Sequence, residues 1–159
     1  MPLLTRQYSK HIEDRGSIYT TYNEFDFPSI KFVQDKVSVS KKGVIRGFHG
    51  DDKTYKLITC LYGAFDLVVF DMDKQTTQKY HLNSEDSFCS SILVPPRYLN
   101  GHQCLSEICI LHYKWSEYYD LEGQYSVYYN DETIKPEWEI LDRIIVSNRD
   151  MSAPSFLEL

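Results

Sequence analysis

Short runs of apolar or alternating residues, separated by turn signals, follow one another through the first 115 residues of the chain. Valine, isoleucine, threonine and tyrosine, which favour strands, are enriched in these runs, and helical periodicity is scarce before the last forty residues. Strands are predicted at residues 17–22, 30–39, 43–48, 55–62, 64–71, 76–82, 90–94 and 107–115. Many short strands indicate a sandwich, jelly roll or barrel. Residues 131–141 are expected to hold a short helical turn or two.

The size and charge of the chain narrow the class of protein. Its 159 residues fit one domain, 1–159, without a linker or repeat. A formal net charge of −6 disfavours nucleic acid as a partner, because duplex-binding proteins usually carry a basic face. No stretch approaches the length of a membrane span, and the first ten residues lack a signal-peptide core. The four cysteines form no CxxC pair, so we expect buried thiols in a cytoplasmic protein without a membrane partner.

Polar side chains gather in residues 43–56, between two predicted strands. Arg46 and His49 are three residues apart, so a regular strand would direct them to opposite faces unless a bulge intervenes. Periodicity alone therefore does not place the two groups in one pocket. The competing interpretation of this segment, which ends at Lys56, is a surface turn with ordinary charges.

An apolar strand at residues 108–115 runs into a cluster of rings and hydroxyl groups that ends at Tyr119. Alternation puts Tyr113 on the same face as Leu111 and Trp115, with Lys114 on the other face. Tyr113 is thus predicted to point inward. The alternative is a core tyrosine whose hydroxyl is satisfied by a neighbour, which is common in β-sandwiches.

Two further segments carry turn signals. Pro95 and Pro96 are expected to end a strand, and Asn100 with Gly101 to form a turn, so the simplest interpretation of His102 is a loop histidine. Arg15 lies in an Asp-x-Gly turn of a kind common in hairpins. Its functional interpretation is a phosphate-binding arginine.

Motifs for metal and nucleophilic chemistry are missing from the sequence. His49 is followed by Gly50 and Asp51 rather than by a second histidine, and the other histidines show no HxH or HxxxH spacing. There is no GxSxG, P-loop or GxGxxG motif, and no cysteine lies in a basic context. We therefore expect neither a metal nor a cofactor.

Several motifs, taken in order along nearly the whole chain, resemble the cupin-fold dTDP-4-keto-6-deoxyglucose 3,5-epimerases, also called dTDP-4-dehydrorhamnose 3,5-epimerases. The stretch 32–49 is similar to that family's signature nearly throughout, and a Ser-x-x-Asp motif at 147–150 closes the series. The matching segments are 14–16, 32–49, 56–57, 63–66, 94–96, 113–114, 118–119, 130–132, 137–138 and 147–150. The resemblance implies an all-β fold, the cupin double-stranded β-helix or jelly roll, with short C-terminal helical segments.

The resemblance also implies catalytic roles. His49 matches the family's catalytic base, and Asp150 matches the carboxylate that orients it. Lys56 matches the lysine near the carbonyl oxygen of the sugar. Tyr113 matches the general acid on the opposite face of the sugar.

The substrate-binding residues implied in the same way are Arg15, Gln34, Lys36, Arg46, Asn100 and Tyr119. The two arginines match phosphate contacts, and Gln34 matches a contact to the nucleotide. Members of this family are usually dimers that exchange N-terminal strands. The resemblance therefore implies a homodimer in which Arg15 reaches into the site of the partner subunit.

The implied reaction suits these residue types. A ketone acidifies the neighbouring C–H bonds, and proton removal leaves an enolate whose charge lies largely on oxygen. A histidine paired with an aspartate is a suitable base near neutral pH, and a lysine ammonium stabilises the oxygen. The implied function is inversion of C3, C5 or both in a nucleotide-linked 4-keto sugar, in deoxysugar or heptose biosynthesis for surface polysaccharide.

The chain departs from the family pattern on the side of the nucleotide and sugar. Asp51 stands where a glutamine is usual, Lys36 replaces an asparagine, Thr20 an acidic residue and Asn100 a histidine, and the turn between the base and Lys56 is shorter. We infer retained chemistry with a changed substrate. Residues 49–56 resemble a branch of the family that acts on GDP-linked 4-keto heptoses.

Three alternative functions remain open on the sequence. A 3,4-ketoisomerase of the same fold typically carries a second histidine beside the first, which is missing after His49. A non-catalytic cupin that binds a sugar nucleotide would be favoured by loss of His49, Tyr113 or Asp150, and all three are present. A metal-dependent cupin lacks its ligands.

Overall fold

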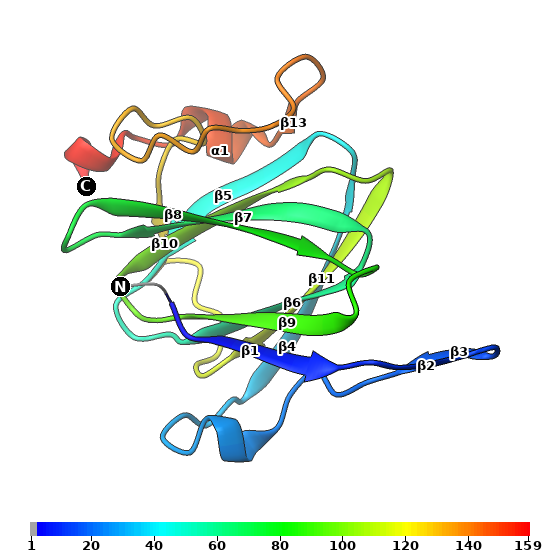
Figure 1. The fold of residues 1–159 in the computed structure, drawn as a ribbon. Coiled ribbons are helices and arrows are strands. Elements are labelled where there is room, and N and C mark those ends of the chain that lie inside the picture. Colours follow the sequence, from blue (N-terminus) through cyan, green and yellow to red (C-terminus); the bar gives the residue numbers. More distant parts are fainter. Residues whose placement is uncertain (1–2) are drawn as a thin grey trace.

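Two sheets face each other in the computed structural model, which describes residues 3–159 (Figure 1). The five-stranded sheet has the order β1 (Thr5–Ser9), β9 (Phe88–Val94), β6 (Lys56–Tyr62), β11 (Ile108–Trp115), β4 (Gln34–Lys41). The six-stranded sheet has the order β12 (Tyr125–Ser126), β5 (Val44–Gly50), β10 (Tyr98–Cys104), β7 (Ala64–Asp71), β8 (Thr76–Asn83), with β13 (Ile145–Val146) pairing in parallel with β5. A separate hairpin, β2 (His11–Glu13) and β3 (Gly16–Ile18), projects from the body of the molecule.

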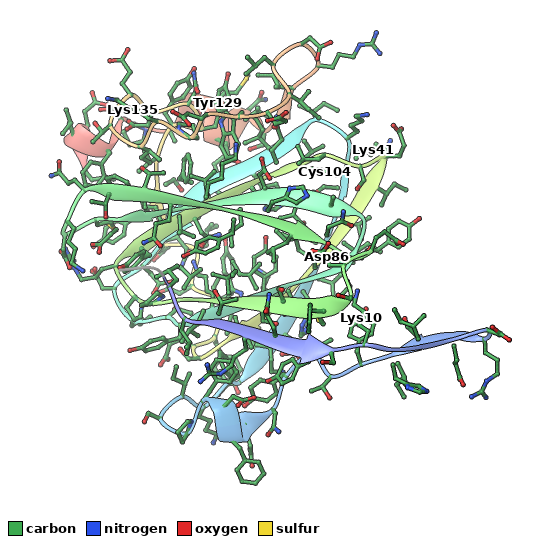
Figure 2. All side chains as sticks on the ribbon, in the orientation of Figure 1. Lys10, Lys41, Asp86, Cys104, Tyr129 and Lys135 are labelled. Carbon is green, nitrogen blue, oxygen red and sulfur yellow. The ribbon has the colours of Figure 1, made fainter. Side chains whose placement is uncertain are left out.

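Hydrophobic alternation explains how the layers stack. On β7, Leu67 and Val69 join a core between the sheets, whereas Val68 and Phe70 join a second core on the outer face of the six-stranded sheet. Nearly the whole of β7 is therefore buried, and its sequence is accordingly an almost continuous apolar run. Side chains from both sheets fill the interior (Figure 2). A third cluster, around Phe27, covers the outer face of the five-stranded sheet.

The C-terminal segment covers the outer face of the six-stranded sheet, where it is drawn in orange to red (Figure 1). It contributes Ile134 and Trp138 to the second core, and it ends in helix α1 (Asn148–Ser152) and the 3-10 turn η2 (Phe156–Glu158). The ring of Phe156 packs edge-on against that of Phe70, with 4.8 Å between the centroids. This packing fixes the position of α1 relative to β5.

The all-β jelly-roll prediction is confirmed, and most predicted strands lie within a few residues of the observed ones. Of the helical turns predicted at residues 131–141, one is present, closed by a hydrogen bond from the Lys135 amide to the Asp131 carbonyl oxygen at 2.9 Å. The rest of this stretch is irregular, and Ile134 and Trp138 anchor it in the second core. Residues 151–159 follow on from α1 and include η2, whose Phe156 packs against Phe70 of β7.

Strand boundaries differ most at the N-terminal side. Of the predicted strand 17–22, only the end of β3 is extended, and the predicted strand 30–39 begins at Gln34. A short 3-10 turn, η1 (Glu24–Asp26), precedes it. Strand β1 was not predicted, since its polar sequence lacks an alternating apolar face.

Strand β10 corrects the turn predicted at Asn100 and Gly101. These residues lie in the middle of an extended strand that pairs with both β5 and β7. The sequence of β10 is largely polar and does not indicate a strand, although the strand is buried along most of its length. His102 is consequently a buried strand residue rather than a loop histidine.

Candidate active site

A cavity of about 690 Å³ opens between the two sheets. Its walls come from β4, β6 and β11 on one side, from β5 and β10 on the other, and from the chain around α1. Eight of the ten predicted site residues line it: Lys36, Arg46, His49, Lys56, Asn100, Tyr113, Tyr119 and Asp150. The two exceptions are Gln34 and Arg15.

A bulge in β5 brings Arg46 and His49 to the same side of the sheet. His49 pairs with Asn100 and Arg46 with His102, so three steps along β5 oppose two along β10. Both side chains therefore line the cavity, which a regular strand would have prevented.

Gly47 lies inside this bulge with a φ of +123°. A Cβ atom there would lie 2.6 Å from the Cα of Gly101 and 2.7 Å from the carbonyl oxygen of Asn100. Only glycine allows so close an approach of the two strands, because it has no side chain. The bulge that presents His49 thus depends on this glycine.

His49 and Asp150 form a hydrogen-bonded pair at the cavity wall. The Nε2 atom of His49 lies 2.7 Å from Oδ1 of Asp150, and the Gly47 amide donates to Oδ2 at 3.1 Å. Burial alone would raise the pKa of the Asp150 carboxyl, which is 3% exposed, but the bonds from His49 and Gly47 hold that pKa below its usual value. The Asp150 carboxylate is therefore charged at neutral pH. It accepts a hydrogen bond from the protonated Nε2 of His49.

Lys56 is a buried ammonium at the floor of the cavity. Its side chain is 3% exposed, its Nζ donates to Oδ1 of Asn100 at 3.4 Å, and it lies 4.8 Å from the centre of the Trp115 ring. The pKa of Lys56 is lowered to about 8, chiefly by burial. A poorly hydrated cation of this kind interacts strongly with a negative charge brought beside it.

Tyr113 points into the cavity, as the alternation of β11 predicts, and Lys114 points to the outer face, where it pairs with Asp35 at 2.8 Å. The Tyr113 hydroxyl lies 3.3 Å from Nδ1 of His102. Burial raises the pKa of the Tyr113 phenol, so the group carries its proton at neutral pH.

The outer part of the cavity is aromatic and basic. The Nζ of Lys36 lies 3.8 Å from the centre of the Tyr119 ring and 4.9 Å from that of Trp115. Gln34 does not line the cavity, but its Oε1 accepts the backbone N–H of Tyr119 at 2.8 Å and so holds that ring in place. Arg46 donates from Nε to the Ser40 hydroxyl at 3.0 Å.

Arg15 lies away from the cavity of its own chain. It occupies the turn of the projecting β2–β3 hairpin, is exposed, and pairs with Glu13 of the same hairpin (Figure 1). The structure of a single chain therefore does not bring Arg15 together with the other predicted site residues.

Sequence reasoning missed several side chains at the cavity. His102, Trp115 and Arg149 line it, and the indole nitrogen of Trp115 has no hydrogen-bond partner among residues 3–159. The signal for His102 was its position two residues after Asn100, which places both on one face of a strand. Asp51, one of the departures from the family pattern, does not line the cavity and instead accepts backbone N–H groups within the loop before β6.

The part of the chain that the structure describes, residues 3–159, holds no cluster of three or more metal-ligating side chains. The same residues include no helix long and apolar enough to cross a membrane. Among the side chains that line the cavity are a histidine–carboxylate pair, an ammonium and a phenol. These groups suit proton transfer next to a developing oxyanion.

Comparisons with known proteins agree with this arrangement. Residues 3–158 match the family described as dTDP-4-dehydrorhamnose 3,5-epimerase. The enzyme of that name from Salmonella typhimurium is 31% identical over 153 residues, which cover 89% of this chain and 84% of the relative. The Escherichia coli enzyme is 32% identical over 150 residues, covering 87% and 80%.

A solved structure extends the likeness to three dimensions. The crystal structure of dTDP-4-dehydrorhamnose 3,5-epimerase from Elizabethkingia anophelis superimposes with a TM-score of 0.86 at 29% identity, covering 99% of this chain and 94% of that one. The chain therefore belongs to the dTDP-4-dehydrorhamnose 3,5-epimerase family, and it is an isomerase.

Proposed function

We propose that the protein inverts C3, C5 or both in a nucleotide-linked 4-keto sugar, by removing a proton beside the ketone and returning one to the opposite face. The observation that carries this proposal is the meeting of the His49–Asp150 pair, the Lys56 ammonium and the Tyr113 phenol in one cavity. The names of the relatives support the same class of substrate.

His49 is the proposed base. The Nε2–H of His49 donates a hydrogen bond to Asp150, so Nδ1 of the His49 ring keeps the lone pair that removes a proton from the sugar. The imidazolium that forms is stabilised by the adjacent carboxylate, as in other His–Asp pairs. The carboxylate is fixed in turn by the Gly47 amide, which limits rotation of the pair.

Lys56 is the proposed partner of the enolate oxygen. Its ammonium is already desolvated before substrate binds, so its attraction to negative charge is greatest when the carbonyl oxygen becomes an oxyanion. Tyr113 then transfers its phenolic proton to the carbon from the other face, which reforms the ketone with inverted configuration.

The alkaline limb of the pH profile tests the role of Lys56. Since its pKa is lowered to about 8, the ammonium is present below that pH and is lost above it. We expect kcat/KM, which reports the free enzyme, to fall above about pH 8. The Lys56→Arg variant keeps its charge and should move this limb to higher pH, even with a lower maximal rate. An unmoved limb would assign the alkaline transition to another group.

A homodimer is part of the proposal. Strand β4 is an edge of its sheet and exposes Val37 and Val39 beside the cavity, while the projecting hairpin exposes Ile12 and Ile18. Apolar residues on both surfaces support docking of one chain's hairpin along β4 of its partner. That arrangement would place Arg15 beside the partner's cavity.

Subunit mixing tests this arrangement. We expect Arg15→Ala to weaken nucleotide diphosphate binding by about tenfold or more, the cost of one charge-assisted hydrogen bond, with no change in thermal stability. Glu13→Gln, which removes the partner of Arg15 within the hairpin, is the matched control and should bind normally.

At substrate concentrations well below KM, a mixture of Arg15→Ala and His49→Gln should be more active than the sum of the two variants measured separately, because a mixed dimer contains one complete site. No gain after exchange of subunits, with both variants dimeric, would place Arg15 outside the partner's site.

A direct test of the proposed function is the configuration of the product. The protein would be incubated with 4-keto sugars linked to dTDP, GDP, CDP and UDP, and the configuration at C3 and C5 read by NMR. Inversion identifies both the reaction and the nucleotide, including the GDP-linked sugars that residues 49–56 suggest. Bound but unchanged sugars across the panel would favour the non-catalytic alternative.

A cytoplasmic location is supported by four free, buried cysteines.

A further inference from the structure

We propose that His102 is a positioning residue for Tyr113: its Nδ1–H donates to the phenol oxygen, which directs the phenolic proton toward the sugar and stabilises the tyrosinate left after transfer. This inference rests on the proposed function. It concerns a residue that is neither the base nor the acid of the reaction.

The position of His102 is fixed by its surroundings. The residue lies in the central strand β10, is 1% exposed, and packs edge-on against Phe65 with 5.7 Å between the ring centroids. Its Nδ1 lies 3.3 Å from the Tyr113 hydroxyl, which joins the six-stranded sheet to β11 across the cavity. A ring held in this way cannot turn freely to another partner.

The tautomer of His102 follows from the groups around it. Burial lowers its pKa to about 3, so the ring is neutral and carries one proton. Its Nε2 is buried without a hydrogen-bond partner among residues 3–159. An unpaired buried N–H is rarer than an under-satisfied acceptor, so the proton belongs on Nδ1, where Tyr113 can accept it.

This direction of donation leaves the phenolic proton of Tyr113 free to face the cavity. The reverse direction would tie that proton to His102 and oppose its transfer. During the step, the O–H bond of Tyr113 breaks and a C–H bond forms on the enolate carbon, while the electron pair left on oxygen makes a tyrosinate. Solvent later restores the proton to the tyrosinate.

The Tyr113 phenol needs a hydrogen-bond donor because it is buried. Burial raises the pKa of Tyr113, so forming the tyrosinate in the site requires additional free energy. Within residues 3–159, the Tyr113 hydroxyl has its hydrogen-bond partner in His102. A preorganised donor aimed at the atom that becomes negative lowers the barrier of this step.

Three substitutions at one position separate the proposal from a structural role. His102→Phe keeps a ring but has no donor. His102→Asn places an amide nitrogen near the position of Nδ1, whereas His102→Gln places one near Nε2. For each variant, net inversion and deuterium uptake in D2O would be measured on the same substrate, together with KM and thermal stability.

We expect His102→Phe to lower the kcat for inversion by about 10- to 100-fold, the cost of losing a hydrogen bond to a charged group, with KM and deuterium uptake changed little. His102→Asn should restore most of the inversion, and His102→Gln should resemble His102→Phe. Wild-type inversion in His102→Phe, or equal loss of inversion and uptake in all three variants, would overturn the proposal. If the wild-type protein neither inverts nor exchanges, the proposed function itself fails.

Discussion

The His49→Gln variant is expected to lose deuterium uptake and inversion together, by about 10²- to 10⁴-fold, which is the usual contribution of a positioned base. The glutamine amide reaches close to the position of Nε2, so it can still donate to Asp150 and keep the buried carboxylate paired. It has no lone pair able to remove a carbon-bound proton. Uptake is read by mass spectrometry of the sugar in D2O, and thermal stability is measured on the same preparation.

The His49→Asn variant is the comparison that tests the hydrogen bond to Asp150. Its shorter amide cannot reach Asp150 in the same way, so this variant should lose stability as well as activity, because a buried charge loses its partner. Normal deuterium uptake by His49→Gln would remove His49 as the base. Loss of nucleotide binding in that variant would instead indicate a role in holding the substrate.

The Tyr113→Phe variant is expected to separate the two half-reactions. The base side remains intact, so deuterium uptake at the carbon beside the ketone should continue, with the proton returned from the face it left. Net inversion should fall by about 10²- to 10⁴-fold, since the phenolic proton is lost. NMR of the recovered sugar gives both quantities, because it reports the deuterium content and the configuration at each carbon.

Tyr113→Phe should also lower the free energy of unfolding by about 1 to 3 kcal/mol, because it leaves the buried Nδ1 of His102 without its hydrogen-bond partner. Equal loss of uptake and inversion would count against Tyr113 as the acid. Unchanged inversion would require a different proton donor on that face of the sugar.

A continuous apolar run was sufficient to predict β7, and alternation within β11 was sufficient to predict the inward direction of Tyr113. The same reasoning failed on β10, where Asn100 and His102 interrupt the apolar pattern of a central strand. These polar residues are tolerated there because the strand borders the cavity. The failure of local rules thus coincides with the site, as expected where function rather than packing selects residues.

The meeting of Arg46 with His49 was beyond local prediction for another reason. It depends on the bulge in β5, which is defined by pairing with β10, more than fifty residues later in the chain. Asp150 is more distant still, 101 residues from His49. It was identified by resemblance to a family motif, since no periodicity in residues 147–150 indicates that α1 turns its carboxylate toward β5.

The central claim is that the cavity removes and replaces a proton beside a ketone. Its most direct test is incubation of the wild-type protein in D2O with the nucleotide-linked 4-keto sugar that it binds, followed by NMR of the sugar. The account predicts deuterium at C3, C5 or both, together with inverted configuration at the labelled carbon. A bound sugar that acquires no deuterium at either carbon would contradict it.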